Sequence, residues 1–320
     1  MSSIPEGNGS VAGAPHLSDG FTETFASRYV QTGDLRQHVV IGGDGPPLLL
    51  VHGWPQSWYA WRHVMPALAR DFTVVAPDQR GVGLTSKPAD GYDTGALAGD
   101  LVMLMDTLGH PRFAVYGTDT GMPIAYALAA DHPDRIERLA VSEAQLPGVS
   151  PSSPLFVPPA INARLWHLMF NQLQAEVNEA LVRGREQIFF GAEFDVSAGT
   201  NKLPGDLVAY YVGRLKNDPD ALRGSFGFYR AVNATIAQNE ERKARRLAIP
   251  VLAIGGAESA GEGIGTAMKL VADDVRSVVL DGAGHWVAEQ APGALLEALT
   301  AFLVPYREAT RHDSGRLAPA

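Results

Sequence analysis

Hydrophobic residues in this chain fall into short continuous runs, and helix-patterned stretches separate several of them. Strands of a parallel sheet are buried on both faces, so they show continuous apolar runs instead of an alternating pattern. Hydrophobic residues between Leu97 and Leu108 recur at helical spacing, and a leucine-rich stretch from 295 to 303 marks a final helix. Alternating strands and helices predict an α/β fold with a mostly parallel, doubly wound sheet. We expect its strands over 39–41, 48–51, 72–76, 113–116, 139–141, 251–254 and 278–280.

The alternation of strands and helices stops after Glu143. Prolines and serines cluster from 147 to 159, which is typical of a boundary loop, and the following pattern to about 239 is helical and rich in aromatic residues. An insertion of this size predicts a helical cap over the C-terminal ends of the strands, where open α/β sheets bind ligands. We expect the following division: a disordered lead-in over 1–20, a core of 21–145 and 240–309, a cap of 146–239 and a flexible tail over 310–320.

Composition limits the classes of function. A hydrophobic content of 46% and a charged content of 19% are typical of a globular protein with an ample core. The net charge of −9 argues against a nucleic-acid partner, because phosphate binding needs a basic surface. There are no cysteines, which excludes disulfides and a cysteine nucleophile. No run approaches the ~18 apolar residues of a membrane span. Residues 1–20 carry no apolar stretch, so we expect no secretory signal, no membrane partner and a cytoplasmic location.

The stretch Gly117-Thr118-Asp119-Thr120-Gly121 lies between a predicted buried strand and a charge-free helical run. Strand, glycine-flanked turn and helix are the context of a nucleophile elbow, which holds the nucleophile in a strained backbone conformation. Asp119 occupies the position where a hydrolase usually places serine. A carboxylate needs no base to attack saturated carbon, and the attack leaves an ester between enzyme and substrate. Taken alone, the motif also fits a plain strand-to-helix turn.

Three further motifs follow predicted strands: His52-Gly53-Trp54-Pro55, a glycine-rich turn over 77–86, and Asp281-Gly282-Ala283-Gly284-His285. With the aspartate elbow they stand in the order expected of α/β-hydrolases, nucleophile first and histidine last. Over roughly 35–145 and 245–305 the sequence therefore resembles the α/β-hydrolase superfamily. The resemblance implies the α/β-hydrolase fold, with the helical cap inserted after the sixth strand.

Hydrolysis of an ester on Asp119 requires a base that activates water and donors for the oxyanion that develops on the aspartyl carbonyl. His285 follows a strand through a glycine-rich turn, and we predict that it is this base. The resemblance to related hydrolases implies that the backbone N–H groups of Trp54 and Thr120 form the oxyanion hole. This chemistry needs no metal or organic cofactor, and we expect none.

Two residues are candidates for the acid that orients His285. Glu258 follows the predicted strand over 251–254, where many members of the superfamily place the acid. Glu143 follows the strand over 139–141, and the segment from Ser142 to Pro147 resembles the corresponding segment of the Cif-type epoxide hydrolases. We favour Glu143 and keep Glu258 as the alternative.

The cap decides what the nucleophile attacks. Opening an epoxide expels an alkoxide, so a donor such as a tyrosine hydroxyl must hydrogen-bond or protonate the ring oxygen. The segments Leu165–Phe170 and Ser225–Asn233 resemble the Cif-type family, in which a histidine and a tyrosine hold the epoxide oxygen. The resemblance implies that His167 and Tyr229 have this role. The predicted function is epoxide hydrolysis to a vicinal diol, with a small epoxide as the partner, and the resemblance hints at a homodimer.

Two other functions compete with this interpretation. Haloacid and haloalkane dehalogenases share the aspartate elbow, the histidine and the cap, and some use a His-Trp-Tyr halide site that Trp166, His167 and Tyr229 resemble. A small carboxylate substrate needs an arginine clamp, whereas the residue after the nucleophile here is Thr120. A non-catalytic receptor or scaffold would be expected to lack one of the residues of the elbow or His285, and all are present.

Overall fold

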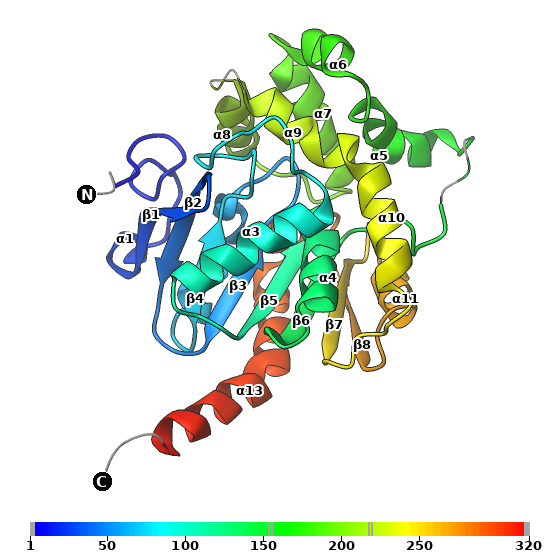
Figure 1. The fold of residues 1–320 in the computed structure, drawn as a ribbon. Coiled ribbons are helices and arrows are strands. Elements are labelled where there is room, and N and C mark those ends of the chain that lie inside the picture. The colour runs from blue at the N-terminus through cyan, green and yellow to red at the C-terminus, as the bar shows by residue number, and fades with distance from the viewer. Residues whose placement is uncertain (1–3, 153, 155, 217, 219, 317–320) are drawn as a thin grey trace.

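The computed structural model describes residues 4–152, 154, 156–216, 218 and 220–316, and an eight-stranded sheet runs through its centre (Figure 1). The strand order is β1-β2-β4-β3-β5-β6-β7-β8. β2 is antiparallel to both β1 and β4, and every other neighbouring pair is parallel. The predicted mostly parallel α/β sheet is therefore confirmed. The strands are Phe25–Thr32 (β1), Leu35–Gly42 (β2), Pro47–Val51 (β3), Thr73–Pro77 (β4), Phe113–Thr118 (β5), Ile136–Ser142 (β6), Val251–Gly256 (β7) and Val275–Leu280 (β8).

The seven apolar runs of the sequence correspond to β2 through β8, and β1 is the strand that the pattern missed. β1 pairs only with β2 in the sheet, and its residues alternate between buried and exposed positions. A strand at the edge of the sheet needs no apolar residue on its solvent side. The search for continuous apolar runs therefore could not detect it.

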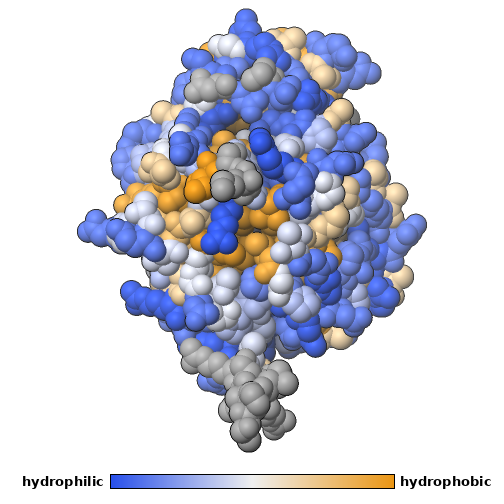
Figure 2. Space-filling model, turned by 60° about the vertical axis from the view of Figure 1, so that its left-hand side comes forward, coloured by the Kyte–Doolittle hydropathy of each residue, from blue (hydrophilic) through white to orange (hydrophobic). Residues whose placement is uncertain are grey.

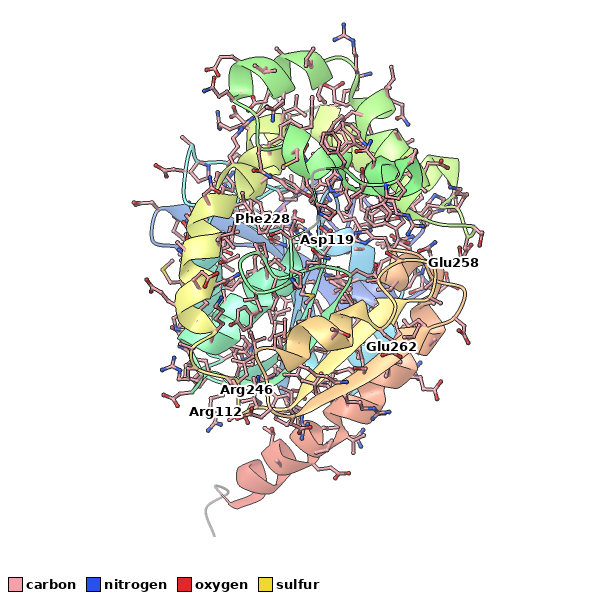
Figure 3. All side chains as sticks on the ribbon, turned by 90° about the vertical axis from the view of Figure 1, so that its right-hand side faces the viewer. Arg112, Asp119, Phe228, Arg246, Glu258 and Glu262 are labelled. Atoms are coloured by element: carbon pink, nitrogen blue, oxygen red, sulfur yellow. The ribbon has the colours of Figure 1, made fainter. Side chains whose placement is uncertain are left out.

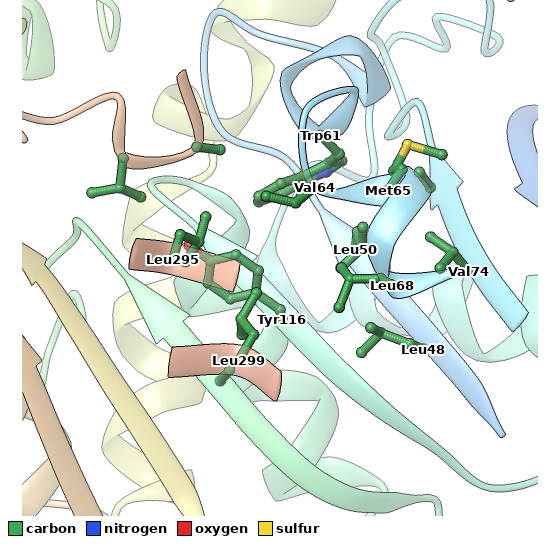
Figure 4. Packing of buried hydrophobic residues seen from close by; sticks show 14 of the residues in the cluster. Leu48, Leu50, Trp61, Val64, Met65, Leu68, Val74, Tyr116, Leu295 and Leu299 are labelled. Carbon is green, nitrogen blue, oxygen red and sulfur yellow. The ribbon is translucent and has the colours of Figure 1, made fainter. Parts of the chain in front are cut away.

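Helices cover both faces of the sheet, so successive residues of a central strand pack into different clusters. Leu48 and Leu50 of β3 belong to one cluster, together with Tyr116 of β5, and Figure 4 shows helical residues such as Trp61 and Leu295 against them. Leu49 and Val51 belong to the cluster on the opposite face. The helices of the core are Phe21–Thr24 (α1), Trp58–Trp61 (η1, a 3-10 helix), Met65–Leu68 (α2), Thr94–Thr107 (α3), Gly121–Asp131 (α4), Gly263–Lys269 (α11), Val287–Gln290 (α12) and Pro292–Arg316 (α13).

The insertion between β6 and β7 is helical, and α5 to α9 lie over one end of the sheet (Figure 1). The last inserted helix, α10, leads back to the core and packs against α3 and α4. A separate hydrophobic cluster holds the cap together, and one of its members, Trp54, comes from the loop after β3. The helices of the insertion are Pro159–Phe170 (α5), Ala175–Val182 (α6), Glu186–Ser197 (α7), Gly205–Lys216 (α8), Ala221–Arg230 (α9) and Val232–Arg242 (α10).

Two expectations about the ends of the chain need correction. The lead-in was expected to be disordered, yet Val11 is buried in the core and its backbone N–H donates to Ser27 Oγ at 2.9 Å. Trp58 Nε1 also donates to the carbonyl of Gly9 at 2.7 Å. At the other end, where a flexible tail was expected from residue 310, α13 continues to Arg316, and residues 317–320 lie outside the described part of the chain. Aliphatic residues scattered among small polar ones gave no periodic signal for the lead-in.

Figure 2, which brings the β1 side of the molecule forward, shows hydrophilic residues over most of this face and hydrophobic residues in a hollow near its centre. None of the helices in the described ranges has both the length and the apolarity needed to cross a membrane.

Candidate active site

Asp119 lies at the turn between β5 and α4, beneath the cap (Figures 1 and 3). Its φ angle is +50°, a left-handed conformation that a residue other than glycine rarely adopts. The two flanking glycines are sterically required: a Cβ on Gly117 would meet the carbonyl oxygen of Gly121 at 2.2 Å, and one on Gly121 would meet that of Val51 at 2.3 Å. The turn therefore has the geometry of a nucleophile elbow.

Two groups hold the Asp119 carboxylate from opposite sides. Oδ1 accepts a hydrogen bond from the backbone N–H of Trp54 at 2.7 Å, and Oδ2 lies 3.1 Å from His285 Nε2. The backbone N–H of Thr120 also lies near this carboxylate and helps to lower its pKa. The side chains of Asp119 and His285 are each 17% exposed, so a small molecule can reach both.

The loop after β3 must approach Asp119 closely to place these donors. A Cβ on Gly53 would stand 2.4 Å from Cβ of Asp119, so only glycine fits at that position. Of the two predicted oxyanion donors, Trp54 hydrogen-bonds to the carboxylate, and the N–H of Thr120 lies close enough to it to lower its pKa.

Asp119 and His285 shift one another's pKa. Burial raises the pKa of the Asp119 carboxyl, but the hydrogen bond and the positive charge of His285 outweigh burial and bring it below its ordinary value. Burial lowers the pKa of His285, yet the hydrogen bonds and negative charges of Asp119 and Glu143 raise it from 6.5 to about 10. At neutral pH the site therefore holds an ionised aspartate against a protonated imidazole.

Glu143 follows β6 and contacts the second nitrogen of His285. Its Oε2 lies 3.1 Å from His285 Nδ1, and its Oε1 accepts the backbone N–H of Gly256 at 2.6 Å. The side chain is fully buried, and the backbone φ of +62° is again in the left-handed region. Strands β5 and β6 are neighbours in the sheet, so residues just after them lie side by side.

Glu258, the alternative acid, lies elsewhere. The residue is half-buried, and its carboxylate accepts solvent-exposed hydrogen bonds from the backbone N–H and the hydroxyl of Thr200, both at 2.6 Å. These hydrogen bonds lower its pKa. Figure 3 shows Glu258 at the periphery of the molecule and Asp119 near the centre.

The two cap residues proposed to bind the ring oxygen pack against each other and against Trp54. The imidazole of His167, on α5, lies parallel to the Trp54 indole with ring centroids 5.1 Å apart, and meets the Tyr229 ring edge-on at 5.9 Å. Tyr229, on α9, is buried. Its burial, followed by the negative charges of Asp119 and Glu193, raises the pKa of its hydroxyl well above the ordinary value. Tyr229 is therefore a stable hydrogen-bond donor near Asp119.

Sequence reasoning missed two residues that support this group. Ser225 Oγ accepts the indole N–H of Trp54 at 2.7 Å, and Glu193 Oε2 lies 3.2 Å from His167 Nδ1. Ser225 gave no signal of its own. Glu193 did, because it is the one carboxylate in the aromatic stretch 188–194 of a cap helix.

A separate cavity of about 40 Å³ lies beside the oxyanion loop. Trp54, Thr120 and Ser225 contribute to its wall, whereas Asp119, His285, His167 and Tyr229 do not. The reacting groups are absent from its lining, so we do not assign it as the substrate site. Among the described residues, no cluster of three or more histidine or acidic side chains is suited to a metal ion.

Comparison with known proteins gives consistent matches. The alpha/beta hydrolase fold family matches residues 46–292. The soluble epoxide hydrolase of Corynebacterium sp. (strain C12) is 34% identical over 275 residues, which cover 85% of this chain and 95% of that protein. A fluoroacetate dehalogenase of Burkholderia sp. is 36% identical over 218 residues, covering 65% of this chain and 70% of that protein. The solved structure of Cfl2 from Burkholderia cenocepacia superposes with a TM-score of 0.85 at 32% identity, covering 94% of this chain and 99% of that one.

Proposed function

This chain belongs to the epoxide hydrolases of the α/β-hydrolase superfamily, and on that premise we propose that it converts an epoxide to a vicinal diol through a covalent ester on Asp119. The observation that carries the proposal is the contact of one carboxylate, Asp119, with both an oxyanion donor and His285. Hydrolysis of an ester on Asp119 needs an oxyanion donor and a base for water, both placed at the carbonyl carbon of the ester.

The first step is attack by Asp119 on a ring carbon. Oδ2 is the attacking oxygen, because Oδ1 is already bound by the backbone N–H of Trp54. The carbon–oxygen bond of the ring breaks as the ester bond forms, and His167 and Tyr229 stabilise the departing oxygen. The raised pKa of Tyr229 supports its part, because the hydroxyl keeps its proton for hydrogen bonding.

The second step is hydrolysis of the ester by a water that His285 activates. Protonated His285 cannot act as a base, and its pKa of about 10 keeps it protonated before the reaction. Ester formation neutralises Asp119 and so removes the largest of the contributions that raise this pKa. His285 then loses its proton and becomes a base in the step that requires one. The oxyanion that forms on Oδ1 remains bound to Trp54 and Thr120.

Glu143 is the acid that we propose for orienting His285. Its contact with Nδ1 fixes the ring so that Nε2 faces Asp119, and its negative charge stabilises the imidazolium. The contacts of Glu258 with Thr200 support its assignment as a surface residue that links the cap to the core.

Dehalogenation is the second candidate, and the 36% identity to a fluoroacetate dehalogenase is the observation that favours it. The charge around the site argues against it. The residue after the nucleophile is Thr120 instead of a cation, and Glu193 lies beside His167, where it would repel a carboxylate substrate. We therefore expect no fluoride release from fluoroacetate under conditions in which epoxides are turned over.

Labelled water tests the covalent route. In a single turnover in H₂¹⁸O with enzyme in excess, the diol should carry unlabelled oxygen, and the peptide with Asp119 should gain the label. Direct attack of water on the epoxide would put the label into the diol and leave Asp119 unlabelled. Fluoride release from fluoroacetate without any diol from epoxides would favour the dehalogenase.

Two further parts of the proposal concern the protein's surroundings. We propose that it works as a homodimer, which light scattering would test, and that it acts in the cytoplasm, which fractionation of cells would test. Neither affects the chemistry at Asp119.

A further inference from the structure

Glu193 is a buried carboxylate that the proposed reaction does not use. It lies on α7 in the segment 188–194, where Phe189, Phe190 and Phe194 are all buried. Only 4% of the Glu193 side chain is exposed. An ionised carboxylate in such surroundings is costly unless a cation and hydrogen-bond donors compensate it.

The groups that compensate Glu193 are His167 and Ser197. Oε2 lies 3.2 Å from Nδ1 of His167, and Oε1 accepts the hydroxyl of Ser197 at 2.8 Å. Among the ion pairs of the described residues, the one that contains Glu193 is this pair with His167. The partner placed to compensate a charge on Glu193 is therefore the imidazole of His167.

The His167 ring is held so that its two nitrogens meet different partners. Trp54 lies parallel to one face, and the edge of Tyr229 closes another side. Nδ1 is buried 3.2 Å from Oε2 of Glu193, at ion-pair distance, and neither of these two atoms has a hydrogen-bond partner within the described part of the chain. Nε2, on the opposite edge of the ring, is the nitrogen left to meet a substrate.

The number of protons held by His167 and Glu193 together decides whether Nε2 of His167 can donate a hydrogen bond or only accept one. With one proton, placed on Nδ1 toward the carboxylate, Nε2 is unprotonated and can only accept a hydrogen bond. With two protons, Nε2 carries N–H and can donate to the oxygen of an opening epoxide. The role proposed for His167 therefore requires the doubly protonated pair.

We propose that Glu193 is a positioning residue that holds His167 as an imidazolium, and that the Nε2 proton of this imidazolium is transferred to the epoxide oxygen. This inference rests on the proposed function. As Oδ2 of Asp119 bonds to the ring carbon, the carbon–oxygen bond breaks with its electron pair on oxygen, which takes the proton. His167 is left neutral with its remaining proton on Nδ1 toward Glu193, and the product is a hydroxyalkyl ester. Solvent returns the proton after the diol leaves.

Nitrogen NMR of histidine-labelled protein tests the charge on His167 without any substrate. The His167 signals are identified by their loss in His167→Gln. At about neutral pH we expect both ring nitrogens of wild-type His167 to show the protonated, imidazolium shifts. In Glu193→Gln we expect one nitrogen to move to the unprotonated position. A neutral His167 in the wild type would overturn the proposal, and beyond the assignment by His167→Gln this result needs only the wild-type protein.

The rate of ester formation tests the proton transfer. It is measured by rapid quench and mass spectrometry in the His285→Gln background, where the ester should persist. Glu193→Gln should slow this step by about 10²-fold, the lower range for loss of a general acid. The matched control is Glu186→Gln, a second buried carboxylate of α7, which accepts a backbone N–H from Gly184 instead of contacting His167. We expect its rate to match that of the His285→Gln parent.

Three results separate this inference from the proposed function. An imidazolium that is lost in Glu193→Gln, together with slow ester formation, supports the proposal. An unchanged rate of ester formation in Glu193→Gln overturns the proton transfer while the covalent mechanism stands. The absence of any ester in the His285→Gln parent overturns the proposed function itself, whatever the charge on His167.

Discussion

Trp54 and His167 lie ring against ring, with centroids 5.1 Å apart and 12° between the ring planes. The backbone N–H of the same tryptophan donates to Asp119 at 2.7 Å. One residue of the core therefore sets the position of the nucleophile through its main chain and that of a cap histidine through its side chain. The link explains how a cap formed by an inserted segment can be aligned with a turn of the core.

The effect of replacing Trp54 on the rate of ring opening should depend on whether the new side chain keeps an aromatic face on which His167 can stack. Trp54→Phe retains a surface for stacking, whereas Trp54→Leu removes it, and both keep the backbone N–H. We expect ester formation to slow by about 10²-fold in Trp54→Leu, as for small displacements of reacting groups, and by much less in Trp54→Phe. Ser225→Ala, which removes only the hydrogen bond to the indole N–H, is the control. Equal losses in the leucine and phenylalanine variants would show that stacking on His167 has no part.

Glu143 and Glu258 should differ sharply when each is replaced by glutamine. Glu143→Gln removes the charge beside His285 and should lower kcat by about 10⁴-fold, as when the acid of a hydrolase triad is neutralised. Glu258→Gln changes an exposed contact with Thr200 and should leave kcat near the wild-type value. Steady-state kinetics on one epoxide compares the two. A large loss in Glu258→Gln with a small loss in Glu143→Gln would reverse the assignment.

Asp119→Asn should lower the pKa of His285, because the hydrogen bond to Asp119 makes the largest of the contributions that raise it to about 10. A pKa raised by folding from 6.5 gives stability that is complete below pH 6.5 and is lost as the pH rises through about 10. The free energy of unfolding should therefore fall more steeply from about pH 7 to about pH 10 in the wild type than in Asp119→Asn. Urea denaturation measures this difference, and NMR titration gives the pKa directly. Parallel pH profiles would contradict the coupling.

Gly53→Ala should damage both stability and activity. The added Cβ would stand 2.4 Å from Cβ of Asp119, so the oxyanion loop must move. We expect a loss of about 1–3 kcal/mol in the free energy of unfolding, as in other overpacked sites, together with slower ester hydrolysis. Gly213→Ala on α8 is the control, because nothing lies within 4 Å of its added Cβ, and it should be neutral or slightly stabilising. An active, stable Gly53→Ala would show that the loop is less constrained than its contacts indicate.

The sequence allowed the core strands and Asp119, His285 and Glu143 to be selected, because each signal is local. A buried strand is a continuous apolar run, and each of the three residues follows such a run within five positions, in the order of the superfamily. The edge strand β1 and the packed lead-in around Val11 gave no continuous run, so they were missed. Domain boundaries near the ends of the chain were correspondingly less accurate.

Contacts between distant parts of the chain could not be read from the sequence. The bond between Trp54 and Ser225 joins residues 171 positions apart, and no local pattern connects them. Glu193 and His167 come from different cap helices, whose relative placement depends on tertiary packing. The sequence thus identified candidate groups, and the structure adds which of them hold one another in place.

Intact-mass spectrometry of His285→Gln after incubation with an epoxide tests the central claim most directly. The variant keeps the nucleophile but lacks the base for the second step, so the ester should accumulate. We expect an adduct with the full mass of the epoxide, located on the peptide that contains Asp119 and absent from Asp119→Asn. No adduct with epoxides that the wild type converts, or an adduct on another residue, would contradict a covalent mechanism through Asp119.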